Sequence, residues 1–129
     1  MEESSIKDEK SFSVETRIHS VIHAGRGVRL FLRTTHNAWI HVGIFIIVVG
    51  LGFYFDITKI EWTMLIMVSG LVFVAEAINT AIEIDINLTS PEYHPYAKDT
   101  KDVSAGAVLI ASITALIVGL VIFIPYMFE

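Results

Sequence analysis

Two carboxylates and an amide recur on one face of a long apolar stretch. Glu76, Asn79 and Glu83 follow the uncharged residues 63–75, with offsets of three and seven positions from the first carboxylate. An α-helix turns by about 100° per residue, so these spacings place the three side chains within roughly 60° of one another, with Asp85 on the opposite side. A carboxylate inside an apolar run that can cross a membrane marks a functional site by default.

These groups could abstract a proton and bind a cation. Glu76 lies inside the apolar run, where a carboxylate can act as general base toward an alcohol at the level of the lipid headgroups. Glu83 lies roughly 10 Å closer to water, where it suits a divalent cation, and Asn79 can orient either carboxylate. Further along, Lys101 can contact a phosphate, and Asp102 can hold Lys101 or a metal-bound water. The set fits phosphoryl transfer from a nucleotide, which depends on positioning and charge neutralisation.

A structural explanation competes with this chemical one. Glu76 could simply pair with a basic residue of another helix, although such a pair does not explain a second carboxylate and an amide on the same face. The sequence contains no Gly-x-x-x-x-Gly-Lys loop of the kind that cradles nucleotide phosphates in soluble enzymes. The residues alone therefore indicate a transferase working at a membrane surface.

The composition indicates an integral membrane protein. The 129-residue chain is 53% hydrophobic, and its apolar residues gather into three blocks instead of recurring at amphipathic intervals. The net charge is −5 and the basic residues form no run, so nucleic acid is not an expected partner. Cysteine is absent, which excludes disulfides and thiolate metal sites.

The expected architecture is all-α, with an N-terminal amphipathic surface helix and three transmembrane helices. Residues 1–12 are polar and are predicted to form a disordered tail, and residues 13–129 a single domain. Apolar residues share one face of the predicted helix 13–34, opposite the arginines that would meet lipid phosphates, Arg26, Arg29 and Arg33. The alternative for this helix is a soluble helix packed on a partner.

The three spans are predicted at about 38–55, 62–83 and 104–124. Thr58 followed by Glu61 fits a capping box at the start of the second helix, and residues 88–100 are predicted to be a polar loop. Eight of the nine lysines and arginines precede the first span or lie between the second and third, whereas Lys59 lies on the other side. The N-terminus is therefore expected in the cytoplasm, and all the candidate polar groups should converge on the cytoplasmic rim.

Several segments together resemble the bacterial integral-membrane diacylglycerol kinase family, which includes the undecaprenol kinases. They are the block Glu76–Glu83, the loop Ser90–His94, and residues 97–102 and 105–109, and the resemblance extends from about residue 20 to the end. It implies an ATP-dependent, magnesium-requiring lipid kinase acting on diacylglycerol or undecaprenol in phospholipid metabolism. It also implies a multi-pass homotrimer of the bacterial inner (plasma) membrane, with active sites shared between neighbouring chains.

The resemblance assigns roles to individual residues. Glu76 resembles the catalytic base, Asn79 the active-site amide, and Glu83 a ligand of the magnesium that bridges the nucleotide phosphates. The positions that resemble nucleotide-binding residues of the family are Glu83, Glu92, Tyr93, His94, Lys101 and Asp102.

One position departs from the family pattern. The family carries a second metal-binding glutamate two residues before the position of Asn37, and this chain has Thr35 there. Threonine offers a hydroxyl but no charge, which weakens the expected metal site. Thr35 therefore leaves open a non-catalytic relative that binds nucleotide or lipid. The intramembrane position of Glu76 leaves open a structural or ion-conducting trimer.

Overall fold

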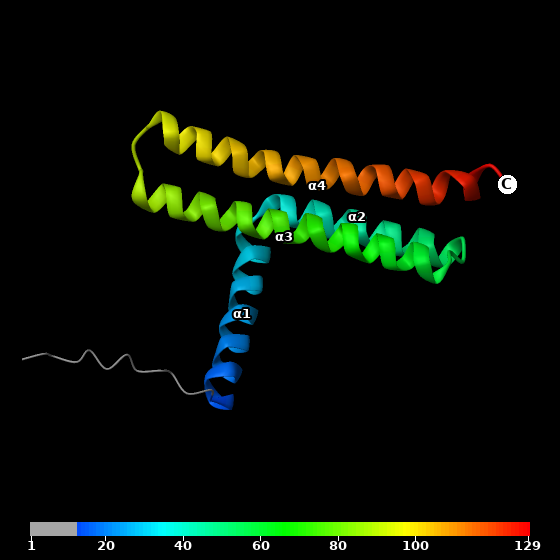
Figure 1. The fold of residues 1–129 in the computed structure, drawn as a ribbon, viewed down its shortest axis with the longest axis horizontal. Helices are drawn as coiled ribbons and strands as arrows, with labels where there is room; N and C mark the ends of the chain where they lie inside the picture. Colours follow the sequence, from blue (N-terminus) through cyan, green and yellow to red (C-terminus); the bar gives the residue numbers. More distant parts are fainter. Residues whose placement is uncertain (1–12) are drawn as a thin grey trace, which may run out of the picture.

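The computed structural model describes residues 13–129, and the predicted disordered tail at residues 1–12 lies outside this range. The described residues form the helices α1 (Val14–Thr34), α2 (His36–Tyr54), α3 (Lys59–Thr89) and α4 (Pro95–Met127) (Figure 1). The last three of these helices are long and apolar enough to cross a membrane. The prediction of an all-α chain with three membrane-length helices after an N-terminal helix is confirmed.

The loop between the second and third spans is shorter than predicted. α3 continues to Thr89 and α4 begins at Pro95, so the connection covers residues 90–94 and not 88–100. Pro95 occupies the first turn of α4, where its missing N–H costs no helical hydrogen bond. His94 caps the same helix, because its Nδ1 accepts a hydrogen bond from the Tyr96 backbone N–H at 3.2 Å. The proline that suggested a loop therefore starts a helix.

The predicted capping box at the start of α3 is present. Thr58 Oγ1 accepts from the Glu61 backbone N–H at 3.3 Å, and Glu61 Oε2 accepts from the Thr58 backbone N–H at 2.7 Å. The same Glu61 oxygen accepts a hydrogen bond from the Tyr126 hydroxyl near the end of α4 at 2.7 Å. A small apolar core of Ile57, Leu65, Ile122 and Phe123 lies at this end of the bundle.

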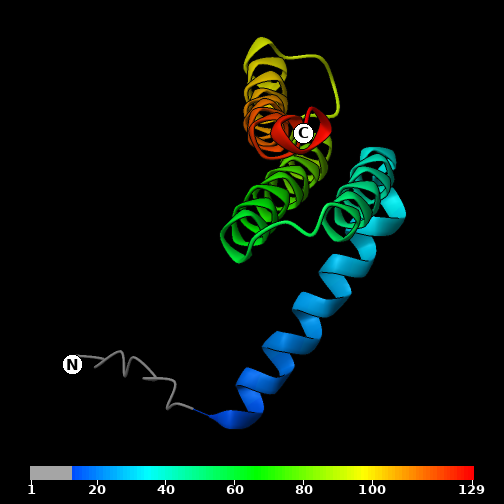
Figure 2. The same cartoon turned by 90° about the vertical axis from the view of Figure 1, so that its right-hand side faces the viewer.

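α3 lies between α4 and α2, as the end-on view shows (Figure 2). α1 leaves this three-helix bundle at a steep angle in both views (Figures 1 and 2). The break falls at Thr35, whose extended backbone (φ −111°, ψ 108°) ends α1 and begins α2. The Trp39 indole N–H braces the junction by donating to the Leu32 carbonyl at 2.7 Å.

The direction and surface of α1 suit a helix that lies along a membrane interface. No residue of α1 is buried, and its apolar residues, including Val14, Ile18 and Val21, are exposed in the monomer. The three arginines predicted to meet lipid phosphates are also exposed. A helix that crosses the bundle direction and carries both kinds of side chain can bury one face among acyl chains and hold the other in the headgroup layer.

Gly52 provides a test of the contact between α2 and α3. A Cβ atom at this position would lie 2.6 Å from Cη2 of Trp62, whereas nothing lies within 4 Å of a Cβ at Gly50. We expect Gly52→Ala to lower the free energy of unfolding by about 1–3 kcal/mol relative to Gly50→Ala, because the added methyl group overpacks the indole. Urea titration in detergent micelles measures the difference. Equal stabilities would show that the Trp62 ring moves aside without cost.

Candidate active site

The predicted carboxylates and amide line one polar depression at the end of the bundle where α1 meets α2. Its volume is about 400 Å³, and its walls come from the α1–α2 junction and from the second half of α3. Its polar lining residues are Thr34, Thr35, His36, Asn37, Glu76, Asn79, Thr80, Glu83 and Asn87. The helical spacing therefore predicted correctly that Glu76, Asn79 and Glu83 would meet in one place.

Glu76 is the most deeply buried polar residue of the described chain, with 1% of its surface exposed. Its Oε2 atom is buried and has no hydrogen-bond partner among the described residues. The nearest basic group is the imidazole of His41 on α2, with Nε2 at 3.6 Å from Oε2. The structural explanation of Glu76 as half of an ion pair thus finds only a histidine, which lies beyond normal hydrogen-bond distance and is charged only when protonated.

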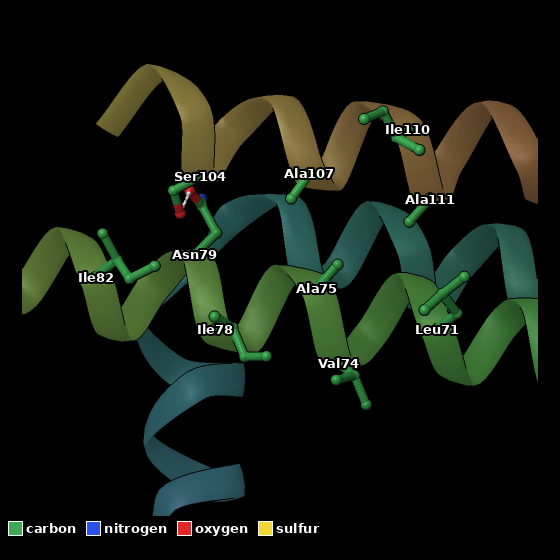
Figure 3. Close-up of a pocket in the computed structure, with 10 residues that line it drawn as sticks. All are labelled: Leu71, Val74, Ala75, Ile78, Asn79, Ile82, Ser104, Ala107, Ile110 and Ala111. Atoms are coloured by element: carbon green, nitrogen blue, oxygen red, sulfur yellow. Dashed lines mark hydrogen bonds between the residues drawn. The ribbon is translucent and has the colours of Figure 1, made fainter. Parts of the chain in front are cut away.

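Asn79 lies one turn further along α3 and is held by α4. Its Oδ1 accepts a hydrogen bond from the Ser104 hydroxyl at 2.7 Å, and both residues are buried (Figure 3). This bond leaves the Asn79 amide N–H groups as donors for a substrate oxygen. Asn79 also lines an apolar groove between α3 and α4 (Figure 3), so this residue borders both the groove and the polar depression.

Thr35 faces the depression. Its Oγ1 lies 2.9 Å from Oγ1 of Thr80, and the Thr80 hydroxyl in turn donates to the Glu76 carbonyl at 3.0 Å. Since the single Thr80 proton is directed to that carbonyl, Thr35 is the donor in the pair. Thr35 and Glu83 border the same depression.

Glu83 and Asn87 form the outer part of the depression, where both side chains are exposed. Because Thr80 is level with Thr35, residues 81–89 extend roughly 13 Å past the α1–α2 junction at 1.5 Å per residue. Lys101 of α4 reaches this extension and donates to Asn87 Oδ1 at 2.6 Å. A lysine that could contact phosphate therefore lies at the edge of the depression.

Asp102 does not hold Lys101, so that part of the prediction is wrong. Its carboxylate instead pairs with Lys98, one helical turn earlier on α4. Adjacent residues on a helix point about 100° apart, whereas residues four positions apart share a face. Lys101 instead donates its hydrogen bond to Asn87.

The predicted nucleotide-contacting loop and the arginines lie outside the depression. Glu92, Tyr93 and His94 are exposed in the connection between α3 and α4, and the His94 side chain caps α4. Arg26, Arg29 and Arg33 are exposed along α1. None of these six side chains lines the depression.

Three residues of this region were not anticipated as partners in the site. Asn87 lies four positions after Glu83, so the same helical spacing could have found it. His41 is the lone histidine of the predicted first span, and nothing in the spacing of residues links it to Glu76 on another helix. Ser104 carries no sequence signal that links it to Asn79, because the two lie on different helices.

The donor set around Glu83 fits a magnesium ion that arrives with a nucleotide. Within residues 13–129, no group of three acidic or histidine side chains could hold a metal alone. Magnesium in proteins commonly takes one or two carboxylates and fills its other positions with water and substrate phosphates. The Glu83 carboxylate, with the Thr35 hydroxyl in the same depression, offers this minimal set, whereas the Asn87 amide oxygen already accepts a hydrogen bond from Lys101.

The three membrane-length helices and the polar depression with its buried carboxylate define an integral membrane enzyme. The family model for prokaryotic diacylglycerol kinase matches residues 22–123. The chain belongs to this family and is a lipid kinase of the inner (plasma) membrane.

Individual relatives agree with this assignment. The undecaprenol kinase of Bacillus subtilis is 39% identical over 106 residues, which cover 82% of this chain and 86% of the relative. The diacylglycerol kinase of Synechocystis is 36% identical over 104 residues, which cover 80% of this chain and 59% of that protein. The diacylglycerol kinase of Escherichia coli is 33% identical over 87 residues, which cover 62% of this chain and 71% of the relative.

Proposed function

We propose that this protein transfers the γ-phosphate of ATP to the hydroxyl of a membrane lipid alcohol, with Glu76 as general base. The observation that carries the proposal is the 1% exposure of a carboxylate that lines a depression shared with Glu83. Glu76 accepts the proton of the lipid hydroxyl while the alcohol oxygen attacks the γ-phosphorus. The bond from the γ-phosphorus to the bridging oxygen breaks, and ADP leaves with that oxygen.

The other residues bind and orient the reactants. Asn79 donates from its amide to the lipid hydroxyl or a phosphate oxygen, and Lys101 neutralises phosphate charge at the edge of the depression. Magnesium would be held by Glu83 with the Thr35 hydroxyl nearby, and it would supply charge neutralisation between the nucleotide phosphates. The nucleotide extends from there toward the exposed loop with Glu92, Tyr93 and His94, and Asp102 keeps Lys98 in place beside it.

The lipid alcohol is undecaprenol or diacylglycerol, and we favour a polyprenol. Both lipids present one hydroxyl at the headgroup level, so the depression by itself does not discriminate between them. The relative named undecaprenol kinase supports the polyprenol, because its match covers 86% of that protein, against 59% for the Synechocystis diacylglycerol kinase.

We also propose that the depression faces the cytoplasm. Eight of the nine lysines and arginines precede the first span or lie between the second and third spans. Segments rich in lysine and arginine usually stay in the cytoplasm, which supports this orientation. ATP is available there, and the exposed arginines of α1, Arg26, Arg29 and Arg33, would meet lipid phosphates at that surface. Residues 13–129 would then act as one kinase domain.

We further propose a homotrimer with shared sites. The resemblance to the family supports this assembly, and so does the wide opening of the depression, which has walls from α1, α2 and α3 but none from α4. A neighbouring chain could supply the missing wall.

The phosphoryl-transfer proposal is tested with radiolabelled ATP and each lipid in mixed micelles. We expect label on the lipid with wild-type protein and a loss of about 10²–10⁴-fold in turnover for Glu76→Gln, because an amide cannot accept the hydroxyl proton. Nucleotide affinity should persist, since the proposal assigns Glu76 to the lipid hydroxyl and not to the phosphates. Asp85→Asn is the matched control, because Asp85 is an exposed carboxylate on the far side of α3.

Near-normal turnover of folded Glu76→Gln would remove Glu76 from the mechanism. Label on neither lipid with wild-type protein, together with measurable nucleotide binding, would favour the non-catalytic alternative. Proton flux through liposomes without ATP would favour an ion-conducting assembly.

Glu83→Gln should raise the magnesium concentration needed for half-maximal activity. The amide keeps the size of the carboxylate but removes its charge, so metal-bound nucleotide is held less tightly. The measurement is a magnesium titration at saturating ATP, with Asp85→Asn again as the control. A curve identical to that of wild type would show that Glu83 is not a metal ligand.

Thr35→Glu should lower the magnesium concentration needed for half-maximal activity. It adds a carboxylate at a position that already borders the depression, and the recovered contact should be worth about 1–2 kcal/mol, or roughly ten-fold in apparent magnesium affinity. Thr35→Gln is the matched control, with the same length and no charge. Superimposed titrations of wild type and Thr35→Glu would place residue 35 away from the metal. Activity that appears only in Thr35→Glu would identify the natural chain as a non-catalytic relative.

A further inference from the structure

We propose that His41 is the positioning residue of Glu76. Its imidazole binds Oε2 of the buried carboxylate and thereby presents Oε1 to the lipid hydroxyl. This inference rests on the proposed function, because it gives the general base a partner that orients it.

The first argument is the unsatisfied oxygen. Glu76 Oε2 is buried without a hydrogen-bond partner among residues 13–129, and a buried acceptor left without a donor typically costs about 1–3 kcal/mol. His41 Nε2 is the one basic nitrogen of the described chain within ion-pair distance, at 3.6 Å. A hydrogen bond between an imidazole and a carboxylate is usually about 2.7–2.9 Å long, so the ring needs to move by less than roughly 1 Å.

The second argument is that the ring is guided from one side. His41 packs edge-on against Phe73, with ring centroids 6.4 Å apart and planes at 77°. Phe73 lies one helical turn before Glu76 on α3, and it is itself packed against Phe45 at 6.1 Å. Phe73 therefore restricts the imidazole from one direction, and Phe45 supports Phe73, while the Glu76 carboxylate lies near Nε2 of the same ring.

The third argument is chemical. A catalytic base works best when a further group fixes its orientation, as in the arrangements of nucleophile, base and orienting residue in hydrolases. Here the sequence of contacts would be lipid hydroxyl, Glu76 and His41. Without the imidazole, the Glu76 side chain could rotate so that neither oxygen meets the hydroxyl, although the carboxylate itself would remain.

The test compares three variants of the full chain in mixed micelles. His41→Phe keeps an aromatic ring against Phe73 but removes the donor, and it should lower kcat by about ten-fold or more, a part of the total contribution of a general base. The KM for ATP should stay within about two-fold. His41→Gln, whose amide can donate to Oε2, should restore most of the activity. Phe73→Leu removes the ring contact that guides His41 but leaves the donor, so it should lower kcat by less than His41→Phe does.

A second measurement does not depend on turnover. Infrared difference spectroscopy of the protein against Glu76→Gln isolates the carboxyl stretching band of Glu76, whose frequency responds to hydrogen bonding. We expect the band to shift in His41→Phe and to return toward its wild-type position in His41→Gln. If His41→Phe does not fold, the histidine ring band is measured in Glu76→Gln instead, and it should shift relative to wild type.

The outcomes separate this inference from the proposed function. Unchanged kcat in folded His41→Phe, or bands that do not move, would overturn the role of His41 while leaving Glu76 as the base. A parallel loss of activity in His41→Phe, His41→Gln and Phe73→Leu would mean that the position serves packing alone. If wild-type protein labels neither lipid, the proposed function fails, and the infrared bands still decide whether His41 contacts Glu76.

Discussion

A carboxylate that is almost fully buried in a membrane-length helix is the constraint on which the rest of this structure depends. Glu76 is 1% exposed, and a charged group at that depth is costly unless a polar environment surrounds it. Polar side chains surround Glu76 on one side only, in the depression that opens toward the α1–α2 junction. A separate groove between α3 and α4, lined mainly by apolar side chains, does not include Glu76 (Figure 3).

The break between α1 and α2 gives that depression its second wall. The extended backbone at Thr35 turns the chain by a steep angle, so α1 can lie along the membrane surface while α2 enters the membrane. The same residue contacts Thr80 and so sets the level of α3 relative to the surface helix. One short break thus positions both the interfacial helix and the groups around Glu76 and Glu83.

Stability and chemistry are divided between the two ends of the bundle. The end with Glu61 and Tyr126 has the capping box, an interhelical hydrogen bond and the cluster around Leu65. The end with Glu76 has polar contacts between single side chains, such as Asn79 with Ser104 and Lys101 with Asn87. An active site needs side chains that are available to substrates, and packing at the opposite end allows this end to stay open.

The sequence by itself determined what depends on position along one helix. The shared face of Glu76, Asn79 and Glu83, the capping box at Thr58 and the three membrane-length helices all follow from spacing within a single segment. The expectation that Thr35 lies near the metal-binding residues came from the family resemblance, and the structure places Thr35 beside the depression. Only the tertiary structure decided the contacts of His41 with Glu76 and of Ser104 with Asn79. It also decided that Asp102 pairs with Lys98 and not with Lys101. Contacts between helices depend on how each helix is rotated and shifted against its neighbour, and the spacing of residues within one helix carries no information about that relation.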